Sequence, residues 1–374
     1  MLEQRRQDEM MDGPSDVSLQ TVHLDDLLEY AISVHGSDLH MSAGLPPMVR
    51  VDGRLAHTPW EALRPVDIQR LVYDILTGDQ IQRFEATSEL DFSYWIGEDA
   101  RFRGNIYRQR GSVGAALRAI PGRIPNLEEL RLPLILEDFA RLPSGLVLVT
   151  GPTGTGKSTT LAAMIDVINN EKECHILTVE DPIEYLHTHK RAMVNQREMG
   201  TDTQTFSAAL RAALREDPDV LLIGEMRDLE TIQTALTMAE TGHLVLATLH
   251  TRTAPQTVDR IVDVFPSHQQ DQIRVQLASA LEAVVGQQLC AKVGGGRIAA
   301  CEVMVATSAV RNLIREGKTF QIPSVIETGS AYGMQTMDSS LAELYRRGQI
   351  TLDEAMNRTL DREAFRRLVQ GSKF

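Results

Sequence analysis

A glycine-rich turn is the strongest chemical signal in the sequence. An apolar run, 145–150, leads into this turn, and the helix-favouring segment 160–165 follows it. The turn fits G-x-x-x-x-G-K-[ST] in the strand–loop–helix context that a P-loop requires. Its glycines allow backbone conformations in which successive N–H groups converge on phosphate oxygens. The turn therefore predicts a nucleotide phosphate site formed by Gly151, Thr153, Gly154, Thr155, Gly156, Lys157, Ser158 and Thr159.

Two side chains of this turn have specific expected roles. Lys157 is placed to reach the β- and γ-phosphates, and the Ser158 hydroxyl to ligate Mg²⁺. The cofactors predicted from the turn are therefore ATP and Mg²⁺.

Acidic residues follow two later apolar runs. The run 174–179 is followed by Glu180-Asp181-Pro182-Ile183-Glu184, and the run 219–223 is followed by Gly224-Glu225. Acids at the carboxyl ends of parallel strands, beside a phosphate site, can hold Mg²⁺ or activate water. We expect Glu225 to act on Mg²⁺ or to orient the nucleophile, and Glu180 and Asp181 to border the nucleotide.

Two histidines flank the apolar run 244–249. His250 follows the run, where it could sense the γ-phosphate, and His243 precedes it. A structural role for His243 stays open, because strand-end placement is only suggestive of function.

These residues must be positioned by two domains. We predict a polar, disordered leader over 1–20, a small α+β (PAS-like) domain of mostly antiparallel strands over 21–120, and a proline-spaced linker over 121–133. Residues 134–374 are predicted to form a RecA-like P-loop ATPase domain with C-terminal helices. The predicted fold class is therefore α/β.

Periodicity predicts the elements of both domains. The small domain is expected to hold helices over 22–36, 65–76 and 79–86, and strands over 38–41, 48–51, 90–96, 101–108 and 112–120. In the larger domain we expect helices over 258–265, 266–288 and 309–316, a further helix after 334–338, and a strand over 298–305.

Composition excludes several classes of protein. The net charge of −13 argues against a nucleic-acid groove, since proteins that neutralise phosphates are usually basic. No apolar run has the length of a bilayer span, and the N-terminus lacks the apolar core of a signal peptide. We therefore expect a cytoplasmic protein. The three cysteines, Cys174, Cys290 and Cys301, form no C-x-x-C pair and predict burial and not a zinc site.

Taken together, these motifs resemble the secretion and type IV pilus ATPase superfamily. The resemblance covers 22 to about 345 and is strongest to its retraction ATPases. The segments that carry it are Gly36-Ser37-Asp38-Leu39-His40, the P-loop, Glu180–Glu184, Gly224–Asp228, Thr241-Gly242-His243 and the amphipathic segment Ala309–Glu316.

The resemblance implies roles for single residues. Glu184 matches the glutamate proposed to activate water, Glu225 matches the Walker B glutamate, and His243 and His250 match the histidine box. Arg103 and Arg118 lie on neighbouring predicted strands, where sequence alone gives them no privileged role. The resemblance implies that in a ring they reach the γ-phosphate of an adjacent subunit.

The resemblance also implies partners and alternatives. It implies a homohexamer that hydrolyses ATP to drive pilus retraction and twitching motility. This ring would act at the inner membrane on a PilC-like platform protein, and a PilU-type ATPase is a further partner that the resemblance allows. No tetracysteine zinc insertion is present, which favours retraction over assembly. A PilU-like accessory ATPase is the nearest alternative, and a RecA-like nucleic-acid translocase, disfavoured by the acidic composition, is another.

Overall fold

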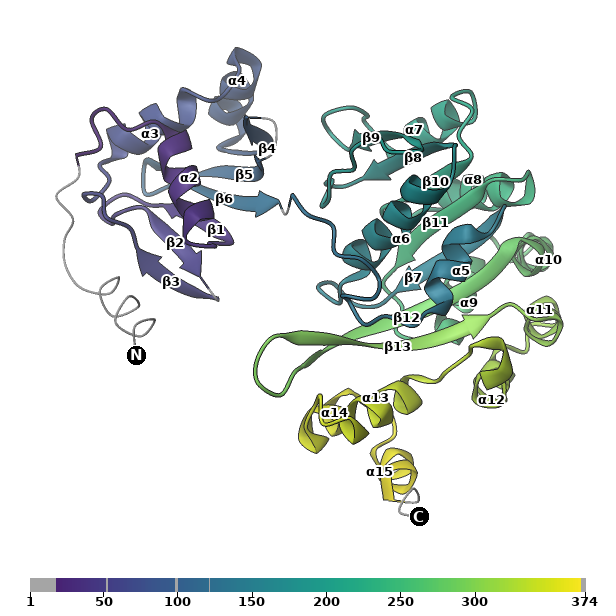
Figure 1. The fold of residues 1–374 in the computed structure, drawn as a ribbon. Helices are drawn as coiled ribbons and strands as arrows, with labels where there is room; N and C mark the ends of the chain where they lie inside the picture. The colour runs from purple at the N-terminus through teal and green to yellow at the C-terminus, as the bar shows by residue number, and fades with distance from the viewer. Residues whose placement is uncertain (1–17, 52, 98–99, 121, 371–374) are drawn as a thin grey trace. The chain divides into compact units, whose positions relative to one another are not determined.

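The computed structural model describes residues 18–51, 53–97, 100–120 and 122–370 (Figure 1). The chain divides into two compact units, Met1–Gly122 and Arg123–Phe374. Among the described residues, no helix combines the length and the apolar character needed to cross a bilayer.

The first unit is built on an antiparallel sheet with the strand order β3-β2-β1-β6-β5-β4. Alternate residues of β5 and β6 face its apolar core, which contains Phe102, Ile106, Ala115 and Leu117. The residues between them therefore lie on the opposite, more polar face. Its described elements are α2 (Leu24–Ser33), β1 (Asp38–Met41), β2 (Met48–Val51), β3 (Arg54–His57), α3 (Pro65–Tyr73), α4 (Gly78–Thr87), β4 (Glu89–Ile96), β5 (Ala100–Gln109) and β6 (Ser112–Ile120).

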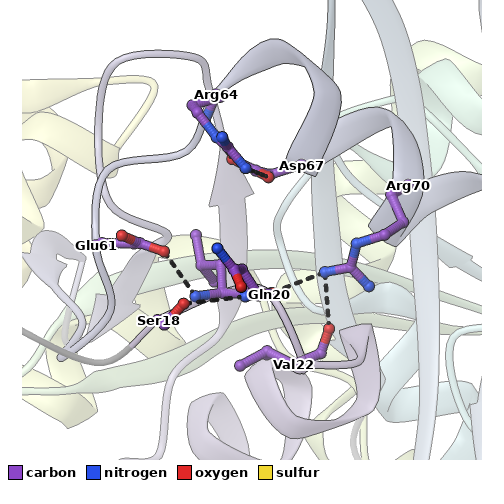
Figure 2. A network of polar contacts seen from close by, with 8 residues as sticks. Ser18, Gln20, Val22, Glu61, Arg64, Asp67 and Arg70 are labelled. Carbon is purple, nitrogen blue, oxygen red and sulfur yellow. Dashed lines mark hydrogen bonds and ion pairs between the residues drawn. The ribbon is translucent and has the colours of Figure 1, made fainter.

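The end of the predicted leader belongs to this unit. Residues 1–17 lie outside the described part of the chain, but Leu19 is buried in the core. Its N–H donates to the Glu61 carboxylate at 2.8 Å, and the Arg70 guanidinium donates to the carbonyls of Leu19 and Val22 at 2.8 and 3.0 Å (Figure 2). The prediction of disorder is therefore wrong at Leu19, because its apolar side chain, although it lies in a polar stretch of sequence, packs in the core of the first unit.

The second unit is organised by a mostly parallel sheet with the strand order β13-β12-β7-β11-β10-β8-β9, in which β13 runs antiparallel to β12. The predicted α/β class is confirmed. Its described strands are β7 (Gly145–Thr150), β8 (His175–Glu180), β9 (Met193–Glu198), β10 (Val220–Ile223), β11 (Leu244–Leu249), β12 (Leu281–Ala291) and β13 (Arg297–Val305).

Helices flank this sheet, and further helices follow its last strand, β13. The described α-helices are α5 (Ile135–Arg141), α6 (Lys157–Glu171), α7 (Phe206–Ala213), α8 (Leu229–Glu240), α9 (Ala254–Asp263), α10 (Gln270–Ala280), α11 (Ser308–Arg315), α12 (Ile322–Thr328), α13 (Met337–Arg346), α14 (Leu352–Arg358) and α15 (Arg362–Gln370). Short 3₁₀ turns cover Thr319–Gln321 and Ser330–Tyr332.

One predicted helix is partly wrong. The segment 266–288 forms α10 only as far as Ala280, and Leu281 begins β12, which lies between β7 and β13. Val284 and Val285 are fully buried on its two faces. β-Branched residues suit such a strand, and pairing on both sides overrides the helical spacing.

The segment predicted as a linker also differs from expectation. Leu127 and Leu132 are buried in the apolar core of the second unit, together with residues of β7 and α6. The segment that contains Leu127 and Leu132 therefore packs as part of the second unit.

Candidate functional site

The predicted motifs meet at one edge of the second sheet. β7 pairs in parallel with β11 and β12, and β10 pairs in parallel with β8 and β11. The carboxyl ends of these strands lead into the P-loop, the acidic segment at Glu180, Gly224-Glu225 and His250. Because parallel strands end at the same edge, four segments that are distant in sequence border one site. We call it the P-loop edge.

Glycine is required at the turn for steric reasons. Gly151, Gly154 and Gly156 have φ values of 145°, 80° and 89°, in a region that L side chains rarely adopt. A Cβ on Gly151 would lie 2.4 Å from the carbonyl oxygen of Gln287 on β12. The loop is therefore pressed against a neighbouring strand while its N–H groups stay at the start of α6, where anions bind well.

Lys157 lies inside the curve of the loop. Its Nζ donates to the carbonyl oxygens of Gly151 and Pro152 at 2.8 and 3.1 Å, and the side chain is buried. Burial lowers the pKa of this ammonium, while the negative charge of Glu225 opposes the shift. The cation is thus held at the point where phosphate oxygens would enter the loop.

The next two side chains of the P-loop both lie near Tyr185. Ser158 borders a small cavity together with Glu180, Tyr185 and His187. The Thr159 hydroxyl lies 3.0 Å from the Tyr185 hydroxyl. The motif pattern gave no reason to single out Tyr185, which follows the acidic segment directly.

Glu225 and His250 are in direct contact. Nε2 of His250 lies 2.9 Å from one carboxylate oxygen of Glu225, and Arg227 donates to the other at 2.7 Å. Burial alone would raise the pKa of Glu225, but the hydrogen bonds from Arg227 and His250 outweigh it and lower the pKa. Glu225 is therefore an ionised carboxylate at neutral pH, as a role near a cation requires.

His243 lies at the other edge of the sheet. Its ring contacts the Met238 carbonyl at 3.0 Å and the Thr241 hydroxyl at 3.2 Å. The strand β11 separates it from His250, a distance of roughly 20 Å at about 3.3 Å per residue. The structure thus does not bring His243 to the P-loop of its own chain.

The acidic segment is folded around Glu180. Its carboxylate accepts from the Thr178 hydroxyl at 2.7 Å, from the Gln196 amide at 3.2 Å and from the backbone N–H of Glu184. Burial nevertheless raises the pKa of Glu180 to about 7, and the nearby charge of Glu184 adds to this. Asp181 is exposed and its charge lies near Arg227. The segment therefore combines the Glu180 carboxyl, whose pKa is raised to about 7, with a second half-buried carboxyl, that of Glu184.

A wider pocket lies on the other side of the P-loop. It has a volume of about 520 Å³, which is enough for a nucleoside. The P-loop side is lined by Gly156, Thr159 and Thr160, and the opposite side by Glu129–Leu132 and by residues of β12 and β13. The segment Glu129–Leu132 was predicted to be part of a linker, so the sequence analysis did not identify it as part of the pocket lining.

Gln287 is a further residue that the sequence did not indicate. It is buried on β12, where its amide donates to the Thr155 carbonyl at 2.9 Å and accepts from the Thr160 hydroxyl at 2.8 Å. Both partners belong to the loop or to the first turn of α6. Gln287 therefore fixes the P-loop from outside the motif.

The two predicted arginines lie on the polar face of the first unit. Arg103 on β5 is directly opposite Arg118 on β6, which is opposite Asp38 on β1, and Asp38 is opposite Arg50 on β2. We call Arg50, Arg118 and Arg103, with Asp38 among them, the arginine row. Within the described residues, the Arg103 guanidinium has no hydrogen bond or ion pair, whereas Arg118 bonds to Asp38 at 2.8 Å.

The donors available for a cation at the P-loop edge are oxygens. In the part of the chain that the structure describes, no group of three or more His, Cys, Asp or Glu side chains could hold a metal ion. Ser158 and Glu225 supply a hydroxyl and an ionised carboxylate, the hard ligands that Mg²⁺ prefers. Mg²⁺ is usually bound through one or two such groups plus substrate phosphates, so this donor set fits it.

Comparisons with known proteins show which family the chain resembles. The family model described as "Type II/IV secretion system protein" matches residues 128–294. The type IV pilus retraction ATPase PilT of Pseudomonas aeruginosa is 50% identical over 340 residues, covering 91% of this chain and 99% of that protein. A crystal structure of the pilus retraction motor PilT with bound ADP superposes with a TM-score of 0.87 at 48% identity, covering 92% and 99% of the two chains. The type IV pilus ATPase PilU of Pseudomonas aeruginosa is 42% identical over 331 residues, covering 88% and 87%.

Proposed function

The chain belongs to the PilT family of type IV pilus retraction ATPases, and from this premise we propose that it hydrolyses ATP to retract a type IV pilus. The observation that carries the proposal is the convergence of Lys157, Glu225 and His250 at one edge of the sheet. The lower identity to PilU makes the accessory ATPase the weaker alternative.

We propose that the P-loop edge binds the phosphates of ATP. The loop N–H groups and the Lys157 ammonium would hold the β- and γ-phosphates, and the pocket along β12 would receive the nucleoside. Ser158 and Glu225 would hold Mg²⁺, which when bound neutralises charge on the phosphate oxygens. Relatives support the nucleotide, since the PilT crystal structure contains ADP.

Glu184 is the proposed residue for orienting the attacking water. It follows the carboxyl end of β8, and its backbone N–H is bonded to Glu180. A carboxylate at this edge can accept a proton from water as it attacks. His250, bonded to Glu225, would couple the γ-phosphate to the end of β11.

We propose that Arg103 and Arg118 act on the nucleotide of an adjacent subunit. Their row carries more positive charge than Asp38 can balance, and exposed guanidinium groups suit a developing phosphate charge. This requires a closed ring, for which we propose a homohexamer. His243 has no proposed contact with nucleotide within its own chain.

The partners follow from the same premise. We propose that the ring works in the cytoplasm at the base of the pilus, against a PilC-like platform protein of the inner membrane, with a PilU-type ATPase as a further partner. Loss of ATP contacts after hydrolysis would let the small unit change its position relative to the core, which is how such a motor could transmit force.

The test is a gene disruption scored for pilus number and surface motility. We expect hyperpiliated cells that do not twitch, with rescue by the wild-type chain and no rescue by Lys157→Ala. Bald cells would instead mean a role in assembly, and normal cells would contradict the proposal. A DNA-stimulated, salt-sensitive ATPase activity of the purified chain would favour a nucleic-acid translocase.

A further inference from the structure

Asp38 occupies the middle of the arginine row. One of its carboxylate oxygens accepts from Nε of Arg118 at 2.8 Å. The other accepts from the Ser37 hydroxyl at 2.7 Å and lies 3.9 Å from Nε of Arg50. The position follows from the register, because β1 lies between β2 and β6 and places Asp38 opposite both arginines.

The carboxylate is held in its charged form. Its side chain is only 10% exposed, so burial disfavours ionisation. The hydrogen bonds from Ser37 and Arg118 outweigh this effect and hold the pKa of Asp38 below its usual range. Asp38 is thus a fixed anionic acceptor on a rigid strand.

Arg118 contacts Asp38 through one nitrogen only, so the other nitrogens of its guanidinium remain available to a ligand. The hydrogen bond uses Nε, and within the described residues the two terminal nitrogens make no hydrogen bond. The Arg118 side chain is 68% exposed despite this contact. An arginine side chain loses conformational entropy when it is fixed, so prior fixing by a neighbour lowers the entropy that is lost on contact with a ligand.

We propose that Asp38 is a positioning residue for Arg118. It holds Nε so that the two terminal nitrogens face the γ-phosphate bound by the adjacent subunit. This inference rests on the proposed function, in which Arg118 acts in trans. Arg103, which has no such acceptor among the described residues, would be ordered only by the phosphate itself.

The test compares ATPase kinetics of Asp38→Asn, Arg118→Ala and the double variant in the assembled ring. We expect Asp38→Asn to lower kcat on the order of tenfold and to leave KM for ATP nearly unchanged, because orientation matters mainly in the transition state. The double variant should be no slower than Arg118→Ala alone, since Asp38 has nothing left to position.

The matched control is Asp91→Asn. Asp91 lies on the same face of the sheet, on β4, and its partner is Asn105 at 3.1 Å and not an arginine. An equal loss of kcat in this control, or losses that multiply in the double variant, would overturn the proposal.

A second variant guards against misfolding. If Asp38→Asn lowers the unfolding midpoint, Ser37→Ala removes one of the hydrogen bonds to Asp38, together with a longer contact to the Arg50 carbonyl, and keeps the Asp38 carboxylate. We expect a smaller loss of kcat in the same direction, and no loss would count against the proposal. If Arg118→Ala itself keeps wild-type kcat, the trans role of Arg118 fails. If Arg118→Ala is slow but Asp38→Asn is not, only the positioning role fails.

Discussion

The P-loop edge of the second unit and the arginine row of the first unit handle charge in opposite ways. At the P-loop edge, Lys157 is bonded to two carbonyls, and Glu225 is bonded to Arg227 and His250. In the arginine row, Arg50 and Arg118 share the carboxylate of Asp38, and Arg103, which has no ion pair among the described residues, lies directly opposite Arg118. Like charges in a cross-strand pair destabilise a sheet.

This difference separates two kinds of site. Where the charged side chains of a site all have partners within one chain, their arrangement is already fixed before the ligand binds. A row of arginines with surplus positive charge lowers the stability of the folded chain unless an anion from another molecule binds to it. Such a row therefore indicates a site that another molecule completes. Under the proposed function, the ring and not the single chain would be the unit of catalysis.

The largest expected effect comes from separating the two sites between subunits. Lys157→Ala and Arg118→Ala should each lower kcat roughly 10²–10³-fold, since each removes a group that we propose to contact the transferred phosphate. Mixed rings of the two variants should regain activity, because some sites combine an intact P-loop with an intact arginine from the adjacent subunit. The measurement is the steady-state ATPase rate after subunit exchange.

The control for Lys157 is Lys172→Ala. Lys172 lies just after α6 and donates to the carbonyls of Ala140 and Leu142, so it makes the same kind of bonds away from the nucleotide. Its replacement should lower stability without lowering kcat to the same extent. Mixed rings that remain as slow as either parent would contradict a site shared between subunits.

The sequence predicted the features that depend on residues close together in the chain. The P-loop, its strand and its helix are contiguous, so the motif and its context could be read together. The order of the strands also placed Glu225 and His250 at one edge, because both follow a parallel strand. Their direct hydrogen bond could not be predicted, since it depends on the β10–β11 pairing and on side-chain conformations.

The rest depended on contacts far apart in the chain. Gln287 lies more than a hundred residues after the loop that it supports, on a strand whose apolar spacing had predicted a helix. Leu127 and Leu132 lie in a proline-spaced segment whose burial depends on a core formed elsewhere. A functional role for Arg103 and Arg118 was predicted only from the family resemblance, because exposed arginines are common on the polar face of a sheet.

A smaller effect is expected from Gln287→Ala, which tests how far the P-loop edge is fixed from outside the motif. The substitution leaves the Thr155 carbonyl and the Thr160 hydroxyl without their partner. We expect the free energy of unfolding to fall by about 1–3 kcal/mol and nucleotide affinity to fall as the loop loosens. Calorimetric titration with ADP and urea unfolding measure the two effects.

Gln288→Ala is the matched control, because the neighbouring side chain on the same strand points to the other face of the sheet. Equal losses in affinity for both variants would mean that strand stability, and not support of the loop, explains the result.

The smallest effect concerns Glu180 and appears as a dependence on pH. The pKa of this carboxyl rises from 4.5 to about 7 on folding, so between these values the folded chain keeps a proton that the unfolded chain has released. The free energy of unfolding should therefore fall as pH rises through this window and stay lowered above it. Glu180→Gln cannot ionise and keeps an acceptor for Thr178 and Gln196, so at pH 8 it should be more stable than the wild type, on the order of 1–3 kcal/mol. Urea unfolding followed by circular dichroism should show the two curves converging towards pH 5, whereas a difference that does not change with pH would mean that the carboxyl is not desolvated at the P-loop edge.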